Sequence, residues 1–120
     1  MRALSDGPLG LESLLVQAWK RYGRTLAVTE CHLGCTRDEQ LRWVLEAWRS
    51  VERLRDGGAD ICALTAWSLL GAYDWNSLLT QDRGAYEPGV FDLRSGEPRP
   101  TAIAGLLKGL AEGKIGRAHV

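Results

Sequence analysis

The chain has 120 residues, 45% hydrophobic and 25% charged, which is the composition of a soluble globular domain with enough apolar side chains for a core. Its 15 basic and 15 acidic residues balance, and no stretch collects lysine and arginine, which excludes an electrostatic surface for nucleic acid or anionic lipid. The longest uncharged stretch, residues 61–73, is well short of the roughly 20 apolar residues that a membrane-spanning helix requires.

The N-terminal residues, Met-Arg-Ala-Leu-Ser-Asp-Gly-Pro, contain no apolar segment of the kind found in signal peptides. We therefore expect a cytoplasmic protein in a reducing compartment. The three cysteines, Cys31, Cys35 and Cys62, are an odd number and too sparse for a disulfide framework. They are expected to be free thiols.

The first half of the chain predicts a helix and then a strand. Residues 8–22 repeat apolar side chains at the spacing of one helical face, with Pro8 at the start and Gly23 at the end. Residues 25–29, Thr-Leu-Ala-Val-Thr, carry no charge and are rich in β-formers, which predicts a strand covered on both faces. Glu30 comes directly at the end of that strand.

A second helix and a second strand follow. Thr36 and Glu39 have the spacing of a capping box, so a helix should begin there. It has one apolar stripe and stops at residues 57–58, two glycines. Residues 60–68 then predict a second buried strand.

The last part of the chain predicts a long loop, a short helix and a tail. Residues 71–95 have the composition of a loop, Pro100 is placed to open an apolar helix, and residues 113–120 form a tail. Buried strands that alternate with amphipathic helices predict an α/β fold with parallel strands and outer helices. Barrel and open sheet both fit this order, and in either one ligands bind at the carboxyl ends of the strands.

Two motifs resemble glycoside hydrolase family 1. Residues 26–30, Leu-Ala-Val-Thr-Glu, resemble its strand-7 segment, which a Thr-Glu pair closes. Residues 66–75, Ala-Trp-Ser-Leu-Leu-Gly-Ala-Tyr-Asp-Trp, resemble its strand-8 signature, Trp-Ser-Leu-Leu-Asp-Asn-Phe-Glu-Trp, in order and spacing. The resemblance extends over residues 8–111. It implies that residues 1–112 are the C-terminal part of a (β/α)₈ barrel, from helix 6 to helix 8, with 113–120 as the tail.

The resemblance also implies roles for four side chains. Glu30 occupies the place of the catalytic nucleophile of a retaining glycosidase. Asp74 would accept hydrogen bonds from sugar hydroxyls, and Trp67 and Trp75 would offer apolar faces to the sugar ring. The chain departs from the family at two points: it has Glu-Cys-His where the family has Glu-Asn-Gly, and Asp-Trp where the family has Glu-Trp.

The catalytic pair that this resemblance implies is incomplete in this chain. The general acid of the family lies at the end of strand 4 in an Asn-Glu motif, and no Asn-Glu pair occurs in this sequence. A whole barrel needs about 250 residues. We therefore expect a fragment that is inactive alone, with an open barrel edge covered by a complementary barrel half or by self-association.

Two other interpretations stay open. The chain also resembles the glycosidase-like domain found ahead of a domain similar to dTDP-4-dehydrorhamnose reductase, which implies a non-catalytic carbohydrate-binding or scaffolding module of a sugar-nucleotide reductase system. Alternatively, Cys31, His32 and Cys35 are spaced as metal ligands, but a fourth ligand has no evident source, so no metal is assigned. No cofactor is implied.

Overall fold

A computed structural model of the chain describes residues 9–34 and 36–113. They fall into two compact units: unit 1 contains the residues up to Leu33 and Asp38–Ala66, and unit 2 contains a short segment around Thr36 and everything from Trp67 onward. No helix in these described ranges combines the length and the apolar character needed to cross a membrane. Apart from Gly113, the predicted tail lies outside the described residues, and so does Pro8.

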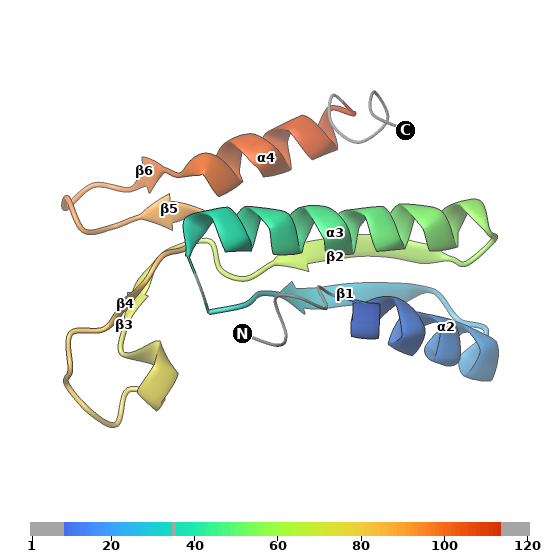
Figure 1. Cartoon of the computed structure of the whole chain (residues 1–120), viewed down its shortest axis with the longest axis horizontal. Helices are drawn as coiled ribbons and strands as arrows, with labels where there is room; N and C mark the ends of the chain where they lie inside the picture. Colours follow the sequence, from blue (N-terminus) through green and yellow to red (C-terminus); the bar gives the residue numbers. More distant parts are fainter. Residues whose placement is uncertain (1–8, 35, 114–120) are drawn as a thin grey trace. The chain divides into compact units, whose positions relative to one another are not determined.

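Unit 1 has the order helix, strand, helix, strand that the sequence predicts. Its elements are α2 (Leu9–Tyr22), β1 (Leu26–Cys31), α3 (Arg37–Asp56) and β2 (Ile61–Ala66). Helix α3 returns alongside the strands, so that β1 and β2 can pair in parallel (Figure 1). The helix stops at the predicted pair of glycines, where Gly58 has a φ of 103°, a conformation that residues with a Cβ rarely adopt.

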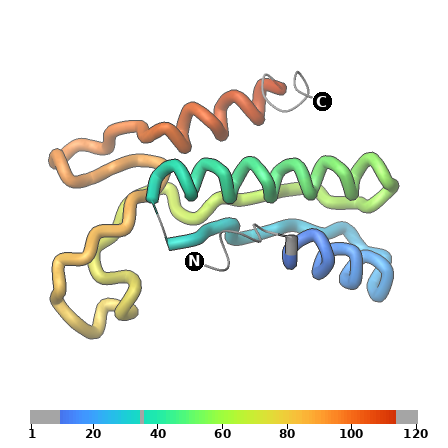
Figure 2. Tube along the Cα trace, in the orientation of Figure 1, coloured from blue at the N-terminus to red at the C-terminus, as the bar shows by residue number. Residues whose placement is uncertain are grey.

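The two strands lie side by side and point the same way (Figure 2). Leu26 pairs with Ile61, Val28 with Leu64, and Cys31 with Ala66 at the carboxyl ends of the strands. This parallel strand pair with its helices makes the chain a mixed α/β protein.

Only one face of the strand pair is buried. Val28 is 8% exposed, whereas its neighbours Ala27 and Thr29 are exposed, and so are Ala63 and Thr65 on β2. Successive side chains of a strand point to opposite faces, so a helix layer on one side covers only every second residue. The prediction of strands covered on both faces is therefore wrong for the described residues.

The core of unit 1 forms between that buried face and the helices. Ile61 is 2% exposed, and the other buried hydrophobic side chains of the unit are Leu15, Val28, Cys31, Val44, Ala47 and Val51. An ion pair adds a link from α2 to α3, in which Arg53 Nη2 lies 2.7 Å from Glu12 Oε2. Because the arginine is more than half exposed, such a pair contributes only about 0.2–1 kcal/mol.

Unit 2 contains short strands where the sequence predicts a loop. Its elements are β3 (Ala72–Tyr73), the 3₁₀ helix η1 (Trp75–Ser77), β4 (Tyr86–Glu87), β5 (Phe91–Asp92), β6 (Arg99–Pro100) and α4 (Ala102–Ala111). Strand β3 pairs antiparallel with β4, and β5 with β6. The loop prediction for residues 71–95 is wrong at β3, β4 and β5, because two residues are too few to show a period in the sequence.

The last helix begins later than predicted. Pro100 lies in β6 opposite Phe91, and α4 begins at Ala102 after Thr101. A proline lacks an N–H group and is tolerated in a strand only at an edge or an end, which is the place that Pro100 occupies.

Backbone hydrogen bonds join β5 to the chain that follows β2. Val90 N–H donates to Ser68 O and Phe91 N–H to Leu69 O, both at 2.8 Å, and Gly71 N–H donates to Phe91 O at 3.1 Å. The residues just after Trp67 are thereby held against β5 along their main chain.

Candidate functional site

Glu30 lies near the carboxyl end of β1. It is the fifth of the six strand residues rather than the residue after the strand, because β1 extends to Cys31. The Glu30 residue is exposed, whereas Cys31 beside it is 4% exposed. Strict alternation would put Glu30 on the buried face with Val28, but the register of the strand pair shifts between Val28 and Cys31. This irregularity leaves Glu30 exposed and Cys31 in the core.

The cysteine cluster considered as a metal site lies only partly within the described residues. Cys31 is buried, and this burial raises the pKa of its thiol to about 11. Cys35 lies outside the described residues. Within the ranges that the structure describes, no group of three or more histidine, cysteine or acidic side chains could hold a metal ion.

The other three predicted site residues belong to unit 2, and two of them form an aromatic pair. The ring centroids of Trp67 and Trp75 are 5.7 Å apart and their planes are inclined by 32°. Trp75 is 40% exposed and Trp67 is half-buried. The Trp67–Ser68 peptide bond is cis. Two indole rings in contact and partly open to solvent form an apolar surface of the type to which sugar rings bind.

Asp74 is buried between the strand β3 and the helix η1, with 7% of its surface exposed. Its carboxylate accepts hydrogen bonds from the backbone N–H groups of Ala85 (2.9 Å), Arg83 (3.1 Å) and Gly84 (3.2 Å). The bond from Ala85, followed by those from Gly84 and Arg83, holds the pKa of the Asp74 carboxyl below its ordinary value. A carboxylate has about four lone-pair positions, and the backbone of this chain occupies three of those of Asp74.

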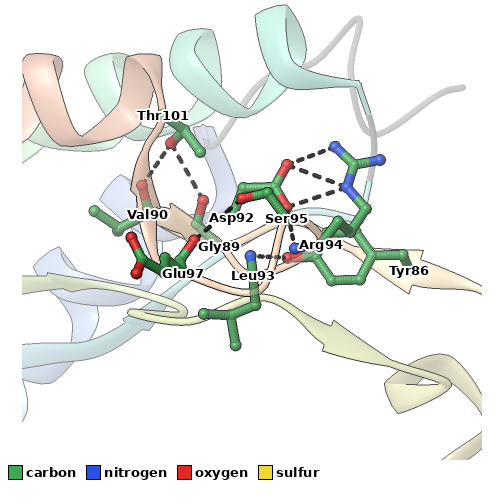
Figure 3. Close-up of polar contacts among 9 residues, drawn as sticks. All are labelled: Tyr86, Gly89, Val90, Asp92, Leu93, Arg94, Ser95, Glu97 and Thr101. Atoms are coloured by element: carbon green, nitrogen blue, oxygen red, sulfur yellow. Dashed lines mark hydrogen bonds and ion pairs between the residues drawn. The ribbon is translucent and has the colours of Figure 1, made fainter.

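Sequence reasoning missed a polar cluster around Asp92 and Arg94 (Figure 3). Arg94 Nη2 lies 2.6 Å from Asp92 Oδ2, and the Arg94 Nε and backbone N–H groups also donate to this carboxylate. The Arg94 guanidinium stacks on the ring of Tyr86, 4.7 Å from its centroid, and the Tyr86 hydroxyl accepts the Leu93 N–H. The cluster thus fastens the turn between β5 and β6 to β4.

Because the pKa of Asp92 is lowered in the folded chain, we predict a loss of stability in acid. Hydrogen bonds from the Arg94 side chain, and then from its backbone, hold the pKa of Asp92 far below the ordinary value of about 3.9. A carboxyl whose folded pKa is depressed contributes stability above its unfolded pKa and loses it as the pH falls toward the folded pKa. We expect the Tm of the chain to fall as the pH drops below about 4.

Asp92→Asn should lower the Tm at neutral pH and flatten this dependence. Asp74 and Glu12, whose pKa values are also lowered, should leave a smaller slope of the same sign. Thermal unfolding followed by circular dichroism at several pH values measures the effect. A variant whose Tm falls as steeply as that of the wild type would contradict the assignment to Asp92.

The chain is similar to solved structures, but no family model and no curated protein matches it. A solved structure, the β-glycosidase from Pyrococcus horikoshii, superposes with a TM-score of 0.62 over 77% of this chain, with 24% sequence identity. The match covers 21% of the β-glycosidase, so the chain spans about a fifth of that protein. This similarity shows that the chain has a glycosidase-like fold.

Proposed function

We propose that the chain is the C-terminal part of a retaining glycosidase-type (β/α)₈ barrel, with β1 and β2 as its strands 7 and 8 and Glu30 as the nucleophile. The observation that carries the proposal is the exposed carboxylate of Glu30 near the carboxyl end of a parallel strand, in a segment with a glycosidase-like fold. In barrels of this class the catalytic residues come from the carboxyl ends of the strands.

The reaction needs two carboxyl groups. A Glu30 oxygen would form a bond to the anomeric carbon of the sugar while the bond from that carbon to the leaving oxygen breaks. A second carboxyl, about 5–5.5 Å away, protonates the leaving oxygen and then activates the water that releases the sugar from Glu30. The family supplies that acid from strand 4, in an Asn-Glu motif that this sequence lacks. We therefore propose that the chain does not hydrolyse glycosides by itself.

We propose that Trp67 and Trp75 bind the apolar face of the sugar ring. Their rings are in contact and partly exposed, which supports this role. A sugar contact from Asp74 rests on the resemblance, and the backbone of this chain already occupies three lone-pair positions of the carboxylate.

Covalent trapping tests the proposal. The chain, joined to the strands that complete its barrel, is incubated with a 2-fluoro glycoside carrying an activated leaving group, and the adduct is mapped by mass spectrometry. We expect one glycosyl adduct, on Glu30, and none in Glu30→Gln. Glu97→Gln, which changes an exposed glutamate between β5 and β6, is the control and should keep the adduct. An adduct that persists in Glu30→Gln would rule out Glu30 as the nucleophile.

The paired indoles favour a second candidate, a non-catalytic carbohydrate-binding module attached to a sugar-nucleotide reductase. An indole platform binds a sugar without a general acid. Quenching of tryptophan fluorescence by sugars, together with the absence of an adduct across a panel of 2-fluoro glycosides, would identify this function. Neither quenching nor an adduct would reject both candidates.

We also propose that the exposed face of the β1–β2 pair is covered in the working protein. In the described residues the sheet has two strands, and Ala27, Thr29, Ala63 and Thr65 are exposed. The cover would be the complementary part of the barrel or a second copy of the chain. Sedimentation over a range of concentrations tests self-association, and a chain that stays monomeric would exclude the second copy.

A further inference from the structure

Asp74 holds both ends of the segment 74–85, which we call the Trp75 loop. At the far end, the carboxylate accepts the backbone N–H groups of Arg83, Gly84 and Ala85, and the Asp74 N–H donates to Ala85 O at 2.7 Å. At the near end, the Asp74 carbonyl accepts the Ser77 N–H at 3.2 Å and the Ser77 hydroxyl at 3.0 Å. One residue therefore closes the whole loop.

The Trp75 loop has little apolar packing of its own. Leu78 and Leu79 are 72% and 66% exposed, and Trp75 is 40% exposed. Burial of hydrophobic side chains contributes little to the order of such a segment, so its conformation depends on hydrogen bonds. Bonds within the turn join Leu78 to Trp75 and Thr80 to Ser77, but in the part of the chain that the structure describes, the bonds that connect the two ends of the segment all involve Asp74.

The direction of the chain into Trp75 also depends on Asp74. This residue has a φ of 56°, in the left-handed region, and precedes the first residue of η1. An aspartate tolerates that conformation better than most residues because its short polar side chain bonds to nearby backbone. The backbone conformation at Asp74 thus sets the direction in which the Trp75 side chain leaves the main chain. The centroid of the Trp75 ring lies 5.7 Å from that of the Trp67 ring.

We infer that Asp74 is a positioning residue, which ties the Trp75 loop and thereby fixes the indole of Trp75 against that of Trp67. Its carboxylate is engaged mainly by this chain's own backbone. The consequence for sugar recognition rests on the proposed function: Asp74 would contribute by placing the Trp75 indole more than by contacting the sugar itself. The side-chain length is part of the argument, because a glutamate at this position would carry the carboxylate one methylene beyond the three N–H groups.

Circular dichroism of the full chain tests the inference without any sugar. Two indoles in contact give an exciton couplet in the far ultraviolet, and its loss in Trp67→Phe identifies the signal of this pair. We expect Asp74→Asn and Asp74→Glu to lose most of the couplet, since the first replaces one acceptor oxygen with a donor and the second misplaces both. Asp82→Asn, an exposed aspartate in the same loop, is the matched control and should keep it.

A measurement on the unmodified chain covers the case in which the variants do not fold. The amide protons of Arg83, Gly84 and Ala85 should exchange with solvent slower by about tenfold or more than those of unbonded loop residues, because each donates to a charged carboxylate. Unprotected amides, or a full couplet in a folded Asp74→Asn chain, would overturn the inference. Failure to form a glycosyl adduct would count against the proposed function alone.

Discussion

Gly89→Ala is expected to destabilise unit 2 by about 3 kcal/mol, at the upper end of the usual effect of overpacking. A Cβ at this position would lie 2.6 Å from both Leu70 C and Ser68 O, and 2.9 Å from Gly71 N. These are backbone atoms of a segment that hydrogen bonds hold against β5, so they cannot move aside as a flexible side chain would. The strands on either side must separate instead.

The matched control for this prediction is Gly105→Ala. Gly105 lies inside α4, and a Cβ built there meets nothing within 4 Å. Alanine is the better helix former by about 1 kcal/mol, so this substitution should raise the stability slightly. Thermal unfolding of the two variants should therefore show Tm shifts of opposite sign. If the Gly89→Ala chain had the Tm of the wild type, the backbone of residues 68–71 would not lie as close to Gly89 as described.

Ile61→Ala is expected to cost about 2–5 kcal/mol, the usual range for removing most of a fully buried aliphatic side chain. Ile61 is 2% exposed and opens β2 opposite Leu26, so the cavity would lie in the core of unit 1, where its neighbours can collapse only partly. The adjacent Cys62 is exposed, and Cys62→Ala should change the stability by less than about 0.5 kcal/mol.

Urea unfolding monitored by far-ultraviolet circular dichroism compares these two variants. The midpoint should fall strongly for Ile61→Ala and stay near the wild-type value for Cys62→Ala, with similar slopes. A larger loss for Cys62→Ala than for Ile61→Ala would mean that the opposite face of the strand is buried, because a shift of one residue exchanges the two faces.

The periodic elements of unit 1 could be predicted from the sequence. In α3, apolar residues recur from Leu41 to Leu54 at helical spacing, and the helix begins directly after Thr36 as the capping pattern indicates. The strands β1 and β2 lie within two residues of their predicted bounds. Burial of the strand faces could not be predicted in this way, because it depends on which other elements cover Thr29 and Thr65.

The short strands of unit 2 depend on partners distant in sequence. Strand β5 is held between the segment after Trp67 and β6, and two residues such as Phe91 and Asp92 have no period of their own. Gly89 lies within the predicted loop of residues 71–95, and nothing in that composition indicates its structural role, a close approach between two backbones.

For the candidate site, motif order identified residue types but not their contacts. The roles of Glu30, Trp67 and Trp75 stay predictions that rest on the resemblance. The Asp74 carboxylate accepts hydrogen bonds from backbone N–H groups nine to eleven residues later in the chain. No local sequence pattern predicts contacts over that separation. The same holds for Arg94, whose stacking on Tyr86 follows from the path of the chain between β4 and β5.

The parallel pairing in unit 1 has a kinetic consequence. Leu26 pairs with Ile61, 35 residues further along (61 − 26 = 35), so the ladder forms only after the chain has closed a loop that contains all of α3. Closing a loop of that length costs about 3 kcal/mol of chain entropy before any ladder bond forms. The hairpin of β5 and β6 closes over only a few residues, and such hairpins form within about 1–10 μs. The strand that carries Glu30 therefore acquires its partner late in folding.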